Sequence, residues 1–190
     1  MKLGETLYVT NKRIWRSWLA KHYKSKSEIW LVYYKKHTGK LRISYNDAVD
    51  EALCYGWIDS TVKSIDDGRF AQRFTPRRNK SVLSQMNKER VRKLITQKRM
   101  TKAGIEAIVH VFNPSTDVAR KPNISLDVRK ALKVNPKAWQ NFQRFPESYQ
   151  RMRLAYIESQ KKHNQSQYEA ALRNLVKMSA QNKRFGLIHE

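Results

Sequence analysis

The sequence predicts an α+β fold, in which a small, mostly antiparallel sheet is packed by helices and followed by a helical C-terminal region. Three observations lead to this prediction. Residues 29–34 (IWLVYY) form a continuous apolar run, typical of a central strand buried on both faces. Residues 57–75 form two extended arms joined at Asp67-Gly68, a dipeptide that favours a hairpin turn. From Ser81 onward the apolar residues recur at helical spacing, and no strand pattern is evident.

The N-terminal segment predicts a short strand and a helix. Residues 7–9 have the strand pattern, and either Thr10 or Asn11 can cap the helix that follows. We expect three to four strands in all, with the helices on one face of the sheet. The strand at residues 29–34 should be central, with the hairpin of residues 57–75 beside it.

A second helix is predicted between the central strand and the hairpin. Ser44 can cap it, with Asp47 as the reciprocal acid three positions on, and Gly56 can end it because glycine adopts positive φ freely. In the second arm of the hairpin, successive side chains alternate between two faces. One face carries Phe70, Gln72 and Phe74, and the other carries Arg69, Ala71 and Arg73.

The chain is predicted to divide at residues 113–123, which contain two prolines with Ser, Thr, Asn and Asp and have the composition of a linker. Residues 1–112 would form the α+β unit with its following helices, and residues 124–190 the helical C-terminal region. Helix starts are predicted at Thr101 (for a helix through His110), at Ser125, at Asn135-Pro136, and at the capping box of Ser166 and Glu169.

Four segments in order carry a resemblance to a known family: IWLVYYKKHTGK (residues 29–40), SYNDAVDEALCYGWIDS (44–60), VKSIDDGRFAQRFTPRR (62–78) and NKERVRKLITQKRMTKAG (87–104). The later segments NPKAWQNF and SYQRMRLAYIESQKK look like the helical tail of the same family. The chain thus resembles the YdeI/OmpD-associated family, often labelled bacteriocin-protection proteins, over most of its length. Leu83 departs from the family pattern, which has a Trp there. The resemblance implies a bacterial protein that protects against bacteriocin-like or cationic-peptide stress, and it names no reaction.

Charge and cysteine content indicate the cellular compartment of the protein and the kind of partner it could bind. One cysteine, Cys54, excludes a disulfide framework and favours a reducing cytoplasm. The N-terminus lacks a signal-peptide pattern, and the longest apolar run is too short for a transmembrane segment. A formal net charge of +23 attracts polyanions, either nucleic acid or an anionic membrane surface. The alternative is that the basic residues form a solvated surface with no partner.

The second functional hypothesis is a nucleic-acid-binding protein that acts through this basic surface. Binding would be independent of base sequence, because the chain has no zinc-finger spacing and no RNP signature. The predicted contacts lie on the hairpin and on the helix after it: Arg69, Arg73, Arg77, Arg78, Lys88, Arg92 and Lys93.

The third hypothesis is an enzyme or small-ligand binder with a site on the hairpin. An aromatic wall, a carboxylate and cationic groups could form a ligand site from Trp57, Asp59, Lys63 and Arg73. The alternative is a structural ion pair between Asp59 and Arg73 across the two strands. On either interpretation these two side chains should touch.

The sequence indicates no catalytic residue, metal ligand or cofactor. The histidines are scattered and share no ligand spacing with Cys54. Cys54 falls late in a predicted helix beside its apolar face, which favours a packed and inert thiol because the helix C-terminus disfavours a thiolate. Gly56 and Gly68 are isolated, so no glycine-rich phosphate-binding loop is present.

Overall fold

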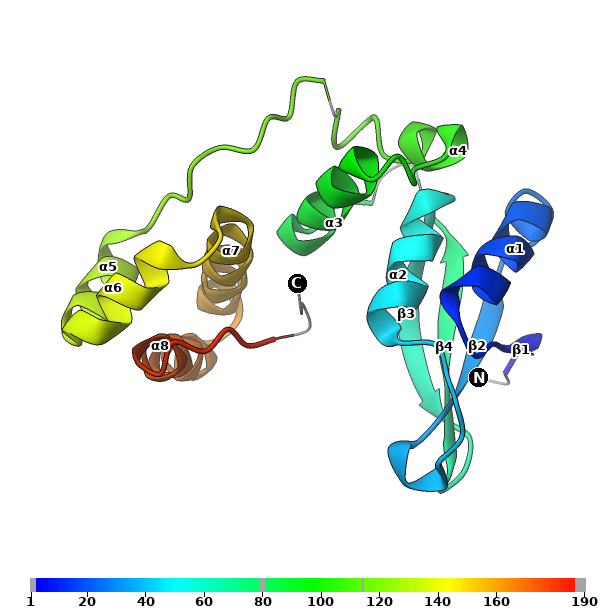
Figure 1. Cartoon of the computed structure of the whole chain (residues 1–190), viewed down its shortest axis with the longest axis horizontal. Coiled ribbons are helices and arrows are strands. Elements are labelled where there is room, and N and C mark those ends of the chain that lie inside the picture. The colour runs from blue at the N-terminus through cyan, green and yellow to red at the C-terminus, as the bar shows by residue number, and fades with distance from the viewer. Residues whose placement is uncertain (1–2, 79–80, 114, 187–190) are drawn as a thin grey trace. The chain divides into compact units, whose positions relative to one another are not determined.

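The computed structural model describes residues 3–78, 81–113 and 115–186, and divides the chain into two compact units, Met1–Asp117 and Val118–Glu190 (Figure 1). The division falls within residues 113–123. Each unit is described by itself below.

The first unit is built on a four-stranded sheet with the order β1-β2-β4-β3. Its strands are β1 (Thr6–Tyr8), β2 (Ile29–Tyr34), β3 (Trp57–Ser64) and β4 (Arg69–Pro76). β1 pairs with β2 in parallel, whereas the β2–β4 and β3–β4 pairs are antiparallel. The predicted fold class and the central position of β2 beside the hairpin are therefore confirmed (Figure 1).

The hairpin of β3 and β4 contains a tight turn and a bulge. The Asp66 carboxylate accepts a hydrogen bond from the Gly68 N–H at 2.9 Å and pairs with Arg69, which fixes the turn. Further along β3 the register shifts between Asp59 and Val62. An extra residue in one strand produces such a bulge, and it changes which face the following side chains occupy.

Two helices cover one face of this sheet (Figure 1). α1 (Lys12–His22) is capped by Asn11, and α2 (Tyr45–Cys54) is capped by the Ser44 side chain, which accepts from the Asp47 N–H at 3.0 Å. Gly56 has φ +74°, as the helix end requires. The 3₁₀ turn η1 (Lys36–Thr38) follows β2. The buried core between helices and sheet includes Trp15, Leu19, Ile29, Leu31, Ala48, Ala52, Leu53, Trp57 and Phe74.

The described part of the first unit also contains α3 (Gln85–Thr96) and α4 (Lys102–Glu106). Thr101 caps α4 as predicted, but α4 ends at Glu106, before His110. Leu83 is buried in a small cluster with Val91, Ile108 and Phe112. An aliphatic side chain therefore fills this apolar cluster at the position where a Trp was expected.

Among the residues of the second unit that the structure describes, four helices form: α5 (Leu126–Lys133), α6 (Pro136–Arg144), α7 (Glu147–His163) and α8 (Gln165–Ala180). Asn135 caps α6 as predicted, and Pro146 lies between α6 and α7. The start predicted for α8 at Ser166 is wrong, because Asn164 caps the helix by accepting from the Ser166 and Gln167 N–H groups. The core includes Val128, Leu132, Ala138, Phe142, Tyr149, Met152 and Leu175. Within the described residues no strand follows Ser81, as expected.

Candidate functional site

Asp59 and Arg73 lie on opposite faces of the sheet, so the prediction that they touch is wrong. Asp59 opposes Phe74 on β4, and side chains directly opposite each other share a face. Arg73, the neighbour of Phe74, therefore points to the other face. There it forms an ion pair with Glu28, with its Nε 2.7 Å from Oε2.

The bulge in β3 is the physical reason for this error. If the pairing of Val62 with Gln72 continued without a shift, Asp59 would oppose Thr75 and share a face with Arg73. One extra residue moves Asp59 to the helix-covered face instead.

The other two residues of the predicted ligand site are separated in the same way. Trp57 lies on the face of Asp59, is 1% exposed and donates its indole N–H to the Tyr23 carbonyl at 3.2 Å. Lys63 opposes Ala71 and lies on the face of Arg73. The four predicted residues therefore do not form one ligand site. Asp59 instead belongs to a group of polar residues on the helix-covered face of the sheet.

This group, called the polar cluster below, consists of Tyr33, Tyr45, Asp59, Gln72 and, at its edge, Arg42. The Oδ2 atom of Asp59 accepts hydrogen bonds from the Tyr45 hydroxyl at 3.0 Å and from the Gln72 amide at 2.7 Å. Gln72 is buried among apolar residues of the sheet. Asp59 and Tyr45 are half-buried, so the cluster reaches the surface at the start of α2.

The hydroxyl of Tyr33 is buried and, within the described residues, has no hydrogen-bond partner. Tyr33 is 2% exposed, and its ring stacks on Phe70 with centroids 5.1 Å apart. Burial is the main cause that raises its pKa, with the charges of Asp59 and Tyr45 acting in the same direction. Burial, followed by Asp59, also raises the pKa of Tyr45 to about 12. Both phenols are therefore neutral hydrogen-bonding groups across the physiological pH range.

Arg42 supplies the positive charge of the polar cluster. It is exposed on the segment before α2, and its guanidinium lies 6.0 Å from the ring centroid of Tyr33 and 5.7 Å from that of Phe70. Its charge lowers the pKa of Tyr33, against the larger effect of burial. Among the described residues it has no carboxylate partner.

Sequence reasoning missed most of the polar cluster. The available signal was Gln72, a polar residue between Phe70 and Phe74 on the apolar face of a strand. Tyr33 and Arg42 gave no local signal, because only the tertiary fold brings Asp59 and Arg42 to Tyr33.

The seven residues predicted to contact nucleic acid differ in whether their charge is exposed and free of an ion pair. Three are in ion pairs: Arg69 with Asp66, Arg73 with Glu28, and Arg92 with Glu89. Arg77 is 6% exposed and donates to the Ser81 and Val82 carbonyls, so it lies in the interior and not on a basic surface. Burial lowers its pKa. Arg78 and Lys93 are exposed and Lys88 is half-buried, and in the part of the chain that the structure describes none of these three forms an ion pair.

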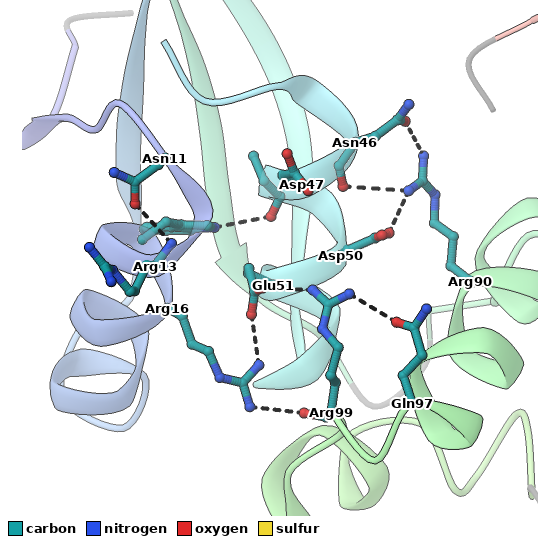
Figure 2. Close-up of polar contacts among 12 residues, drawn as sticks. Asn11, Arg13, Arg16, Asn46, Asp47, Asp50, Glu51, Arg90, Gln97 and Arg99 are labelled. Carbon is teal, nitrogen blue, oxygen red and sulfur yellow. Dashed lines mark hydrogen bonds and ion pairs between the residues drawn. The ribbon is translucent and has the colours of Figure 1, made fainter. Parts of the chain in front are cut away.

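Arginines from α1, α3 and the turn after α3 pair with acidic residues of α2 and have a structural role. Figure 2 shows Glu51 between Arg16 and Arg99, with carboxylate–guanidinium distances of 2.7 and 2.6 Å. Glu51 is buried, and Arg16 also donates to the Arg99 carbonyl. The residue before Glu51, Asp50, pairs with Arg90, which also donates to the Asn46 side chain (Figure 2). These contacts tie α2 to α1, to α3 and to the turn after α3.

Cys54 is fully buried at the end of α2, as predicted. Burial raises the pKa of its thiol to about 11, and a hydrogen bond with Arg16 opposes this effect only in part. The thiol is therefore protonated at neutral pH, which supports an unreactive side chain.

The second unit has an apolar groove of about 420 Å³ between α5 and α8. Its lining consists of the apolar residues Ala131, Leu172 and Val176 and the charged residues Glu169, Arg173 and Lys177. This volume falls in the range of small-molecule sites.

Over residues 3–78, 81–113 and 115–186, no group of three or more His, Cys, Asp or Glu could hold a metal ion. In the same ranges, no helix has both the length and the apolar character needed to cross a membrane.

Two family models match the sequence. Residues 7–107 match a domain of unknown function, DUF8412, and residues 122–182 match the family described as bacteriocin-protection, YdeI or OmpD-associated. The four segments of the sequence resemblance fall in the first match, and the two tail segments fall in the second. No curated protein and no solved structure matches the chain.

Proposed function

This chain belongs to the DUF8412 domain family and carries a bacteriocin-protection, YdeI or OmpD-associated domain in its C-terminal region, and from this premise we propose that it protects a bacterial cell against bacteriocins or other cationic-peptide stress. The observation that carries the proposal is the match over residues 122–182, which covers helices α5 to α8. We place this activity in the cytoplasm, consistent with a single, buried cysteine.

The sign of the charge limits how such protection can work. A chain of net charge +23 repels cationic peptides at long range, so capture of the peptide by the overall field of the protein is disfavoured. The same field attracts the anionic surfaces that cationic peptides bind. We therefore propose that the protein competes for these polyanionic surfaces, and that Arg78, Lys88 and Lys93 contribute to the contact.

Survival of a sensitive bacterial host that expresses the full chain tests the proposal. After challenge with a cationic peptide bacteriocin, we expect markedly more survivors than in cells with an empty vector. Equal survival would reject the protective function.

A charge-matched pair of variants tests the mechanism. The triple variant R78A/K88A/K93A should lose protection, whereas K12A/R13A/K21A on α1 removes the same charge and should retain it. Retained protection in both variants, at equal protein levels, would reject the proposed contact and leave the protective function standing.

Sequence-independent nucleic-acid binding is the second candidate. Lys88 and Lys93 lie on α3, Arg78 precedes it in the sequence, and none of the three has an ion-pair partner among the described residues. Phosphate neutralisation releases counterions, so affinity should fall steeply with salt. Titration of duplex DNA, single-stranded DNA and RNA at low salt and at about 150 mM, where the screening length is about 8 Å, decides it. Binding that persists at the higher salt and weakens in R78A/K88A/K93A would favour this function. We expect binding only at low salt.

A further inference from the structure

We propose that the polar cluster binds a small zwitterion, such as a free amino acid or the two charged ends of a short peptide. The ammonium group would meet Asp59, and the carboxylate would meet Arg42. This site does not include Arg78, Lys88 or Lys93. It joins residues of β2, β3 and β4 with the first residue of α2 and the segment before it.

The first support is an unmatched carboxylate. Both partners of Asp59, the Tyr45 hydroxyl and the Gln72 amide, are neutral, and both bind Oδ2. Oδ1 has no hydrogen-bond partner within the described residues. By contrast, Glu28 and Glu51 of the same unit are each paired with arginine. A half-buried carboxylate that is held by neutral donors alone is suited to receive a cation.

The second support is a cation, Arg42, that acts on the same tyrosine, Tyr33, as the Asp59 carboxylate does. The guanidinium of Arg42 lies over the stacked rings of Tyr33 and Phe70, and within the described ranges it meets no acid. Its planar array of N–H donors matches a carboxylate. The start of α2 adds the partial positive charge of a helix N-terminus near the same end of the cluster.

The third support is the hydroxyl of Tyr33. It is buried on the face that carries Gln72 and Asp59, and no described group satisfies it. An unsatisfied buried hydroxyl is unfavourable, so a group that reaches it from outside gains a hydrogen bond at little desolvation cost to the protein. The ammonium group of a zwitterion would pair with Asp59, its carboxylate would pair with Arg42, and its polar atoms could bond to the Tyr33 hydroxyl. A simple anion or a simple cation would satisfy only one half of the cluster.

Isothermal titration of the full chain with glycine, L-alanine and L-phenylalanine tests the proposal. The same titration with N-acetyl-L-phenylalanine and L-phenylalanine amide removes one charge of the ligand at a time. We expect at least one free amino acid to bind, and both blocked forms to bind on the order of tenfold more weakly, since each loses a charge-assisted hydrogen bond. Glucose, a neutral polyol, should not bind.

Variants of the acidic, basic and phenolic residues of the polar cluster test whether the amino acid binds there. Arg42→Ala changes an exposed side chain and should weaken amino-acid binding on the order of tenfold, as should Asp59→Asn. Tyr33→Phe should weaken binding while leaving the unliganded protein as stable as before or more so, because it removes an unsatisfied hydroxyl. Arg13→Ala and Asp67→Asn are matched controls on exposed residues and should bind like the unchanged protein.

The inference is overturned if no free amino acid binds, if glucose binds in their place, or if the blocked forms bind as well as the free ones. It is also overturned if Arg42→Ala and Asp59→Asn both leave binding unchanged. A loss of stability in Tyr33→Phe would show that the hydroxyl is already satisfied by a bound water, and would remove the third support. None of these outcomes bears on survival in the bacteriocin challenge.

Discussion

The variant Glu51→Gln should destabilise the first unit by removing the charge that holds two arginines. Glu51 is buried, and its carboxylate pairs with Arg16 and Arg99. Breaking a buried pair by removing one partner costs about 3–5 kcal/mol when the remaining charge stays buried. Here the arginine side chains are 35% and 26% exposed, so water can solvate part of the released charge. We therefore expect a loss of about 2–3 kcal/mol, near or just below the lower end of that range.

Urea unfolding followed by tryptophan fluorescence measures this loss. Four of the five tryptophans, Trp15, Trp18, Trp30 and Trp57, lie in the first unit, so the signal reports mainly on its unfolding. Glu5→Gln is the matched control, because Glu5 forms an exposed pair with Lys26 and such pairs contribute less than about 1 kcal/mol. Equal midpoints for the two variants at equal denaturant slopes would refute the role assigned to Glu51.

Three further predictions concern the same unit. Cys54, with a pKa raised to about 11 from 9.0, should react with iodoacetamide near neutral pH about 100-fold more slowly than in the unfolded chain, and rapid native labelling would contradict its inert state. Stability should change little between pH 8 and 9 and should fall as pH rises from about 9 to about 12, because Cys54 and Tyr45 lose their protons in the unfolded chain before they do so in the folded one. Urea midpoints between pH 8 and 12 measure this, and a flat profile would argue against the raised pKa values. Gly104→Ala should lower the thermal midpoint, because a Cβ there would lie 2.3 Å from the Cys54 carbonyl oxygen, and an unchanged midpoint would mean that α4 can move away from α2.

Local chemistry explains which parts of the fold could be predicted. The six apolar residues of β2, the Ser44 cap of α2 and the Asn135 cap of α6 are each specified by residues close together in the sequence. A helix cap needs only a side-chain oxygen and the N–H groups two or three residues on. Such local interactions do not depend on the rest of the chain, so the structures that they predict are found in the folded protein.

The candidate site could not be predicted in the same way, because tertiary contacts decide it. The bulge in β3 has no strong local signature, yet it determines whether Asp59 faces Arg73 or the helices. Glu28 lies 45 residues before Arg73, so nothing in the hairpin sequence indicates their pairing. Arg77 has the same sequence character as Arg78, and only the packing of the following segment buries one and exposes the other.

Because acids are few in this chain, the lack of a cationic partner for Asp59 among the described residues is informative. The chain has 39 Lys and Arg against 16 Asp and Glu, so a cation partner is easily found for any carboxylate that needs one. Arg73 is only one strand away from Asp59, and the bulge keeps the two apart by placing them on opposite faces. A carboxylate that merely stabilised the hairpin would gain more from the unbulged register, where it could share a face with that arginine. The observed register instead leaves Asp59 with neutral donors beside an unsatisfied tyrosine hydroxyl, an arrangement that contributes little to the fold and is well suited to a ligand carrying its own positive charge.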